Sequence, residues 1–256
     1  MRVVAVHPDV LVATSAVWQT TCTIIRSGDE AFVVDSPVLP EELEALPAVL
    51  ERAGFPLSGL LATHGDWDHL LGRLAFPDAS LGVAESTATR LHREMGVAQR
   101  ALRDFDDRWY VRRERPLGLG QVQALPVPGR LELGEAGEEL ELHETGGHTS
   151  DGMAVLAARA GVLVCGDYLS PVEIPMISEG GSRDVYVATL ERLAPLVERA
   201  GVTVPGHGEP LEAQRALAIL REDLDYLRSL PDAELPLARR GEAQRAVHAE
   251  NVERLA

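Results

Sequence analysis

The segment from Thr63 to His69 constrains the fold of this chain more than any other. Directly after the apolar run Leu60 to Ala62, it places four potential metal ligands within six residues, namely His64, Asp66, Asp68 and His69. Metal ligands must converge to about 2–2.6 Å from a common point. Side chains two residues apart share a face of an extended chain, so His64 and Asp66 should point one way, and the two later donors, at a turn into a helix, should point at a second place. The segment therefore predicts a loop at the end of a buried strand that can serve two metal ions.

The alternative for this segment is a solvated polar loop whose carboxylates cap a helix and whose histidines are incidental. Helix caps use Ser, Thr, Asp or Asn singly, and two histidines with two aspartates in six residues are not typical of them. We therefore favour the metal loop.

Composition narrows the classes of function. The chain has 256 residues, 45% hydrophobic and 25% charged, and its 24 basic residues against 40 acidic ones give a formal charge of −16. All basic residues are arginine, which excludes a Schiff-base lysine and a Walker-type phosphate lysine. The acidic balance argues against a nucleic-acid partner, since such binding depends on cationic contacts to phosphate. We expect a small-molecule substrate instead.

The sequence has few features that would direct the protein to a membrane or form a disulfide framework. The first residues form a short strand pattern without the features of a signal peptide, and apolar runs fall short of the roughly 18 residues of a membrane span, so we expect a cytoplasmic protein with no membrane partner. Cys22 and Cys165 are far apart and lie in apolar strand-like sequence, which predicts buried free thiols.

Hydrophobic periodicity predicts an α+β fold made of two similar halves. The first third alternates short β-rich runs with turns, and residues 40–53 have the spacing of an amphipathic helix before Gly54. Further helices are expected near Leu70, from Ser86, and over residues 98–109, 185–199, 210–230 and 237–255; strands are expected at 60–63, 80–83, 121–127, 139–144, 153–158, 161–165 and 202–204. Segment 86–115 fits a lid over a site, an insertion, or a dimer face, which leaves a homodimer open. The expected unit is a single domain, 1–256, with its core at about 1–210 and C-terminal helices over 211–256.

Three further loops carry metal-binding side chains, each after a predicted strand and each containing glycine. They contain His148, Asp167 and His207. Glycine allows the sharp turns that point one side chain toward a crowded centre. A single such loop is weak evidence, but four in one chain predict a shared site.

The order of these motifs resembles the metallo-β-lactamase superfamily, whose signature is His-x-His-x-Asp-His, then Gly-His, Asp and Gly-His. The resemblance covers the chain from Asp35 to His207. It implies a four-layer αβ/βα sandwich of two mixed β-sheets flanked by helices, with two divalent metal ions at the edge between the sheets. It also implies the ligand sets: one metal held by His64, Asp66 and His148, the other by Asp68, His69 and His207, and Asp167 as a bridge. Asp35 would tie down the metal loop from outside.

Asp66 departs from the family pattern, because most members have a histidine at this position. Three carboxylates against two divalent cations would leave a formal charge of +1 where the usual pattern leaves +2, so water bound there should be less acidified. Oxygen donors also move the preference from zinc toward iron or manganese. In this respect the loop is similar to that of the flavodiiron branch, which carries glutamate at this position and a flavodoxin module for which this chain has no room. We expect zinc, with iron or manganese as alternatives.

The resemblance implies a metal-dependent hydrolase in which a bridging hydroxide attacks an ester, thioester, lactone or amide, with Asp68 also orienting the water. Tyr168, next to Asp167, fits either a donor to the oxyanion or leaving group or a packing residue. His143 reads as a histidine on a strand surface. The alternative function is a di-iron protein that binds or reduces oxygen, which would need an external electron donor. Nuclease activity ranks third because of the charge.

Overall fold

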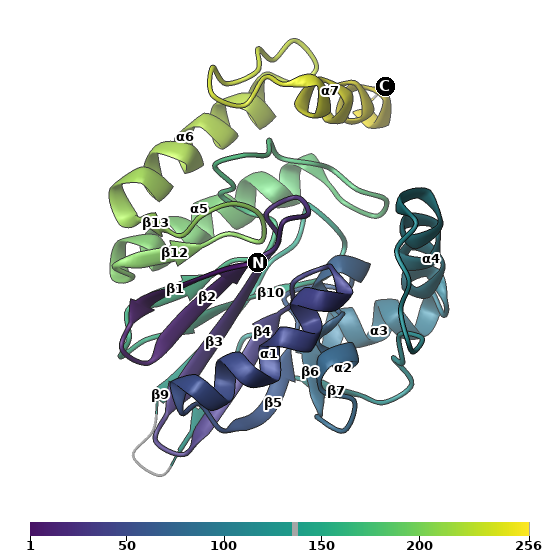
Figure 1. The fold of residues 1–256 in the computed structure, drawn as a ribbon. Coiled ribbons are helices and arrows are strands. Elements are labelled where there is room, and N and C mark those ends of the chain that lie inside the picture. The colour runs from purple at the N-terminus through teal and green to yellow at the C-terminus, as the bar shows by residue number, and fades with distance from the viewer. Residues whose placement is uncertain (135–137, 256) are drawn as a thin grey trace.

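The structure, a computed structural model, describes residues 1–134 and 138–255, and residue 256 of the expected C-terminal region lies outside them. Two mixed β-sheets lie at its centre (Figure 1). The first has seven strands in chain order: β1 (Arg2–His7), β2 (Val10–Thr14), β3 (Thr21–Ser27), β4 (Glu30–Asp35), β5 (Leu57–Leu61), β6 (Leu81–Ala84) and β7 (Val122–Leu125). β1 to β4 pair antiparallel, and β4 to β7 pair parallel.

The second sheet has six strands in the order β13, β12, β11, β10, β9, β8. Their bounds are β8 (Gly129–Leu133), β9 (Glu138–Glu144), β10 (Met153–Ala157), β11 (Val162–Val164), β12 (Val202–Val204) and β13 (Leu211–Glu212). β11 and β12 pair parallel, and the other neighbours pair antiparallel. Strand β8, which follows the Val127-Pro128 turn, was not predicted from the sequence; its alternating half-exposed pattern is short and interrupted by charged residues.

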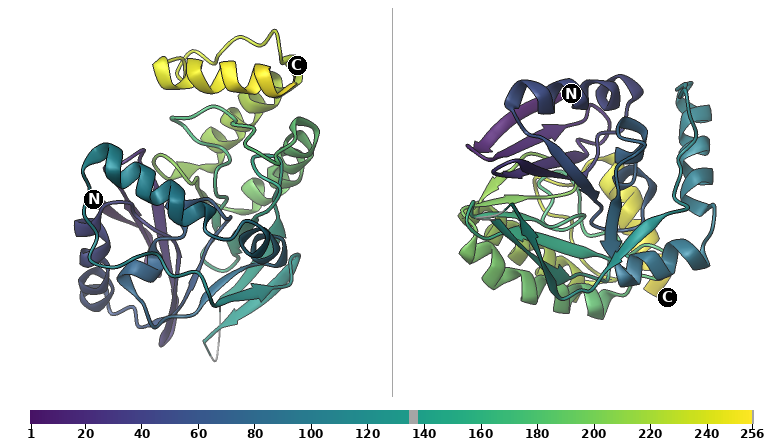
Figure 2. Two further views of the ribbon diagram at one scale, coloured as in Figure 1. Left: turned by 90° about the vertical axis from the view of Figure 1, so that its right-hand side faces the viewer. Right: turned by 90° about the horizontal axis from the view of Figure 1, so that it is seen from below.

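Helices cover the outer face of each sheet. Beside the first sheet lie α1 (Pro40–Ala53), the 3₁₀ turn η1 (Trp67–His69), α2 (Gly72–Ala75), α3 (Glu85–Arg93) and α4 (Val97–Trp109). Beside the second lie α5 (Arg183–Arg199) and α6 (Ala213–Ser229), and α7 (Glu242–Leu255) lies further out. Figure 2 shows α7 set outside α6. The predicted four-layer α+β architecture is therefore confirmed.

The layers follow from the alternation of side chains along the strands. In β2, Val10 and Val12 belong to a buried cluster shared by both sheets, whereas Ala13 faces the helices of the first half. The cluster between the sheets also holds Val155 of β10 and Val164 of β11. A strand buried on both sides needs apolar residues at every position, and β10, which is buried along its whole length, has the sequence Met-Ala-Val-Leu-Ala.

Local signals explain the ends of the first helix. Pro40 occupies the first turn of α1, where a missing amide hydrogen is tolerated, and Leu43, Leu46 and Leu50 form its buried face. Gly54 ends the helix with φ of 69°, a left-handed conformation that glycine adopts without a steric penalty.

Three predicted helices have different bounds in the structure. The helix expected from residue 210 begins at Ala213, because residues 211–212 form the unpredicted strand β13, which pairs with β12. The helix expected near Leu70 is divided into η1 and α2, because the metal loop is still turning through residues 67–69. The last helix begins at Glu242 rather than at 237, since the preceding segment is held in a non-helical form by Arg239. The side chain of Arg239 is fully buried and donates to Asp223 at 2.6 Å and to the carbonyl of Glu173 at 2.8 Å.

Both cysteines are buried free thiols, as predicted, and burial raises the pKa of each. Among the described residues, the helices are all too short or too polar to cross a membrane.

Candidate metal centre

The four predicted loops meet at one edge of the sandwich, where strands of both sheets end. Asp35 ends β4, the metal loop follows β5, and the loops bearing His148, Asp167 and His207 follow β9, β11 and β12. Hydrogen bonds join the two halves there: the amide of Met153 donates to the carbonyl of Thr63 at 2.7 Å, and that of Thr21 to the carbonyl of Gly206 at 2.8 Å. Backbone hydrogen bonds between the two halves therefore hold this edge of the sandwich together.

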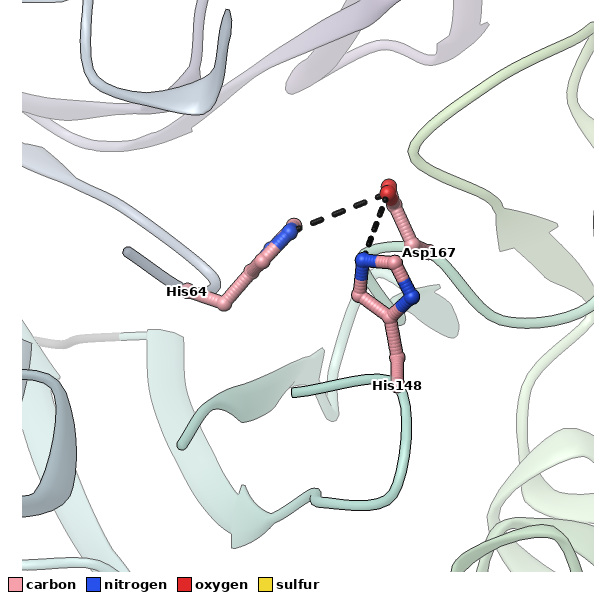
Figure 3. A group of neighbouring side chains, drawn as sticks. All are labelled: His64, His148 and Asp167. Atoms are coloured by element: carbon pink, nitrogen blue, oxygen red, sulfur yellow. Dashed lines mark ion pairs between the residues drawn. The ribbon is translucent and has the colours of Figure 1, made fainter. Parts of the chain in front are cut away.

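The first expected ligand set lies together. His148 Nε2 is 3.3 Å from Asp66 Oδ2 and 3.3 Å from Asp167 Oδ2. His64 Nε2 is 3.6 Å from the same Asp66 oxygen and 3.7 Å from the same Asp167 oxygen. Figure 3 shows the imidazoles of His64 and His148 directed at the Asp167 carboxylate.

The second expected set gathers around the other oxygen of Asp167. His69 Nε2 and His207 Nε2 lie 3.1 and 3.3 Å from Asp167 Oδ1, and 3.7 and 3.6 Å from Asp68 Oδ2. Asp167 therefore presents one oxygen to each group of histidines, which is the arrangement that a bridging ligand requires.

Buried atoms without partners indicate that these residues fit metal ions. Among the described residues, His64 Nε2, His69 Nε2, His148 Nε2 and Asp167 Oδ1 are buried and make no hydrogen bond. A buried polar atom left unpaired costs about 1–3 kcal/mol, and four converging in one place are unusual in a stable fold. Divalent cations would satisfy all of them, and the donors fall into two groups in which the ligand atoms lie within 4.8 Å of one another.

The outer nitrogen of each histidine contacts a fixed group. His148 Nδ1 donates to the carbonyl of Met176 at 2.8 Å, and His207 Nδ1 to that of Trp18 at 3.2 Å. A carbonyl can only accept, so Nδ1 carries the hydrogen, and in the neutral ring Nε2 keeps its lone pair for a metal. His64 Nδ1 lies 3.1 Å from the hydroxyl of Thr63.

Asp35, at the end of β4, contacts the metal loop through its carboxylate. Its carboxylate accepts from the amide of Thr63 at 2.8 Å and from the Thr63 hydroxyl at 2.9 Å, and it lies 3.0 Å from His69 Nδ1. Its φ of 59° is a left-handed value that Asp adopts more readily than most residues. The resemblance implies that Asp35 ties down the metal loop, and its carboxylate makes three contacts with that loop.

Opposed effects set the pKa values of the centre without metal. Burial alone would lower the pKa of His148, but the Asp66 contact and the Asp167 charge outweigh it and raise this pKa to about 9. Burial is likewise outweighed at His207, where the Asp167 carboxylate raises the pKa to about 10. For Asp167, burial would raise the pKa, but the charges of His207 and His69 hold it well below its usual range. Metal binding at the centre would therefore displace protons from His148 and His207.

Arg90 of α3 is a contact of the centre that the sequence did not reveal. Its guanidinium donates to Asp66 Oδ1 at 2.8 Å and to Asp151 Oδ1 at 2.8 Å, and Asp151 Oδ2 in turn accepts from the amide of Gly65 at 2.9 Å. Arg90 and Asp151 thus hold the metal loop at Gly65 and Asp66, whereas Asp35 holds it at Thr63 and His69. Arginines at similar spacing occur throughout α3 and α4, so no local pattern distinguishes this one.

A second unpredicted contact comes from α7. Asn251, fully buried, donates to the carbonyl of Pro175 at 2.7 Å and accepts from the amide of Ile177 at 2.8 Å. These two residues flank Met176, whose carbonyl receives the hydrogen bond from His148. Asn251 therefore fixes the segment that orients His148.

Tyr168 and His143 differ from the expected ligands. The Tyr168 side chain is buried, its ring packs on Tyr186 with centroids 4.7 Å apart, and its hydroxyl accepts from the amide of His148 at 3.4 Å. Burial raises the pKa of the phenol. These contacts favour the packing role over the catalytic one. His143 lies on β9 beside Glu141, at 3.2 Å, and is not part of either group of donors.

A cavity of about 220 Å³ adjoins the metal loop. Gly65 to Asp68 form one wall, and residues of α3 and α4 form the other, from Arg90 to Ala101. Segment 86–115, for which the sequence left several roles open, therefore contributes a wall beside the candidate centre.

Comparison with known proteins agrees with this arrangement. A family model described as the metallo-beta-lactamase superfamily matches residues 16–235. No curated protein sequence matches significantly.

Among solved structures, a metallo-beta-lactamase family protein from Thermus thermophilus is similar, with a TM-score of 0.69 and 22% identity over 98% of this chain and 95% of that one. The DIM-1 metallo-beta-lactamase gives 0.65 and 18% over 89% and 97%, and a metallo-beta-lactamase from Pontibacter korlensis gives 0.62 and 17% over 86% and 98%. At these identities, the likeness establishes the fold.

Proposed function

Because the chain belongs to the metallo-beta-lactamase superfamily, we propose that it is a dinuclear metal-dependent hydrolase that cleaves an ester, thioester, lactone or amide bond of a small molecule. The observation that carries the proposal is the set of buried, unpaired nitrogen and oxygen atoms that converge on Asp167. Two divalent ions held there would supply Lewis acidity to a carbonyl and lower the pKa of a water molecule.

The residues of the chain divide the remaining tasks. The four histidines and Asp167 would hold the ions, and the outer contacts of the histidines with carbonyls, a hydroxyl and the Asp35 carboxylate orient their rings. Asp68 belongs to the second ligand set and also borders the cavity beside the loop. We assign it to accept a hydrogen bond from the attacking water and so to orient it.

Asp66 is the expected ligand that bears most on the choice of metal. Its carboxylate is shared between the His148 side and Arg90, so the guanidinium offsets part of the added negative charge. Arg90 also faces Asp151 and Glu94, and the offset is therefore incomplete. We propose zinc as the resident metal. The oxygen donor of Asp66 also favours a second candidate, a di-iron protein that binds or reduces oxygen.

Metal analysis of the purified protein separates the two candidates. Protein isolated without added metal is examined by elemental analysis and by its visible spectrum, then stripped and reloaded with zinc, manganese or iron before assay on a panel of esters, thioesters and lactones. Colourless protein with two zinc ions per chain and turnover of panel members supports the hydrolase. Two irons per chain, oxygen consumption on reduction and no turnover would overturn it.

A pair of histidine variants provides the control. His148→Ala removes an expected ligand, whereas His143→Ala removes a partly exposed histidine five residues earlier, on strand β9. We expect the first to lose metal and activity together and the second to retain both.

A further inference from the structure

Aromatic and aliphatic side chains line both walls of the cavity beside the metal loop. Trp67 lies on the loop side, and Leu91, Val97, Ala98 and Ala101 lie on the helix side. The Trp67 ring packs against two others, with centroids 5.0 Å from Phe105 and 5.7 Å from Trp18, and those two rings contact each other at 5.4 Å. Aromatic contacts of this kind fix the ring, so the wall is preformed.

The same cavity reaches the candidate centre. Asp66 and Asp68 both border it, and they belong to the first and second expected ligand sets. A molecule whose carbonyl sits at the centre would therefore place its adjoining substituent against Trp67. At about 220 Å³ the cavity is smaller than the roughly 300–1,000 Å³ of a site for a whole ligand, so it suits one substituent.

Charge around the cavity selects against anions. Its polar lining includes the carboxylates of Asp66, Asp68 and Glu94, and among the lining residues Arg90 is the single cation. All three arms of that guanidinium are engaged: Nη2 with Asp66 at 2.8 Å, Nη1 with Asp151 at 2.8 Å and Nε with Glu94 at 3.1 Å. Metal ions bound at the centre would offset the charges of Asp66 and Asp68, so the discrimination falls to Glu94: a carboxylate on the substituent would meet this charge, and the one lining cation is already paired.

We propose that this cavity binds an uncharged, apolar acyl or side-chain group of the substrate, and that Trp67, Ala101 and Glu94 set this specificity. The proposal rests on the hydrolase function for its turnover test, but binding to the cavity does not require turnover. An uncharged ester or lactone with a chain of several methylenes is the expected substrate class, and its counterpart with a terminal carboxylate is discriminated against.

Three methyl ketones test binding without hydrolysis: acetone, 2-heptanone and 6-oxoheptanoate, each titrated calorimetrically into the metal-loaded protein. Each methylene that becomes fully buried contributes about fourfold in affinity, so we expect 2-heptanone to bind at least tenfold more tightly than acetone. We expect 6-oxoheptanoate to lose at least tenfold relative to 2-heptanone. Equal affinities for the three ketones would overturn the proposal, even if the protein proves to be a hydrolase.

Two variants locate the binding. Ala101→Phe fills the cavity from α4, and Arg103→Phe adds the same ring on the exposed side of that helix. The first should abolish the advantage of 2-heptanone, and the second should preserve it, with metal content and thermal unfolding measured for both. Glu94→Gln removes one carboxylate and should narrow the discrimination against 6-oxoheptanoate. If Ala101→Phe folds, retains metal and still prefers 2-heptanone, the assigned cavity is wrong.

Turnover gives a separate result. Among p-nitrophenyl acetate, p-nitrophenyl hexanoate and mono-p-nitrophenyl adipate, the hexanoate should have the highest kcat/KM by about tenfold or more. Failure of all three esters with retained ketone selectivity would refute the proposed ester hydrolysis and leave the cavity assignment standing. Comparable kcat/KM for hexanoate and adipate would refute the specificity.

Discussion

Replacing Arg90 by methionine should destabilise the protein by about 3 kcal/mol. Methionine keeps most of the apolar stem but removes all three donor groups. The Asp151 side chain, only 1% exposed, would keep its charge and lose its cation, and a buried hydrogen bond to a charged group contributes about 1.5–3 kcal/mol. The contact with Asp66, which is 26% exposed, should add about 1 kcal/mol, and the Glu94 contact less than that. Breaking a buried ion pair typically costs about 3–5 kcal/mol, so the sum lies at the lower end.

The control is Arg93→Met on the same helix. Arg93 also pairs with Glu94, at 2.6 Å, but its side chain is 64% exposed, and such a pair contributes about 0–1 kcal/mol. Both variants are unfolded in urea with a chelator present, so that metal binding does not alter the comparison. For a chain of this size, 3 kcal/mol corresponds to a drop in Tm of about 6–12 °C.

A double-mutant cycle assigns the loss to its cause. Combining Arg90→Met with Asp151→Asn should show a coupling energy of about 2 kcal/mol, because Asn keeps an acceptor for the Gly65 amide but removes the uncompensated charge. Equal losses for Arg90→Met and Arg93→Met, or no coupling with Asp151, would refute the view that this guanidinium anchors the metal loop.

The other predictions concern the support of the metal ligands. In metal-free protein, His148 and His207 have pKa values raised from 6.5 to about 9 and about 10. Their contribution to the stability of the fold is therefore complete below pH 6.5 and is lost as pH rises through 9–10. The free energy of unfolding in urea should fall from pH 7 to 10, and a rise would contradict this. Asp35→Asn keeps a residue that tolerates positive φ but removes a negative charge. Zinc affinity, measured against a competing chelator dye, should fall about 10–100-fold. An unchanged affinity would mean that Asp35 is merely structural. Asn251→Ala should weaken zinc binding by about tenfold in the same assay, while circular dichroism shows that α7 remains folded. Wild-type zinc affinity in this variant would show that the Met176 carbonyl does not need the hydrogen bonds of Asn251. Asp66→His should bind zinc more tightly and shift the pH–rate profile to lower pH, and the absence of both changes would rule out the charge argument for this carboxylate.

Local patterns were sufficient for most of the secondary structure. Helices such as α1 and strands such as β3 have a clear period and clear punctuation by proline and glycine, so their bounds follow from the sequence to within a residue or two. Strand β8 was missed, because its charged, half-exposed residues are stabilised only by pairing with β9. The start of α7 was wrong, because the burial of Arg239 depends on contacts with α6 and with the loop before α5.

The sequence by itself determined the candidate donor residues, their order and the loops that carry them. A ligand set of this kind is readable because four donors are neighbours in the chain and each of the others follows a glycine turn after a strand. His64, Asp68 and His69 need no knowledge of distant residues to be recognised as candidates.

Only the tertiary structure decided which partners these donors have. Arg90 reaches Asp66 and Asp151 across 24 and 61 residues of chain, and Asn251 reaches the segment beside His148 across 74 or more. Ion pairs and hydrogen bonds depend on a few ångströms of separation, and that separation is set by how two sheets and their helices pack. Periodicity and spacing record which face a residue occupies, but they do not record what lies opposite it.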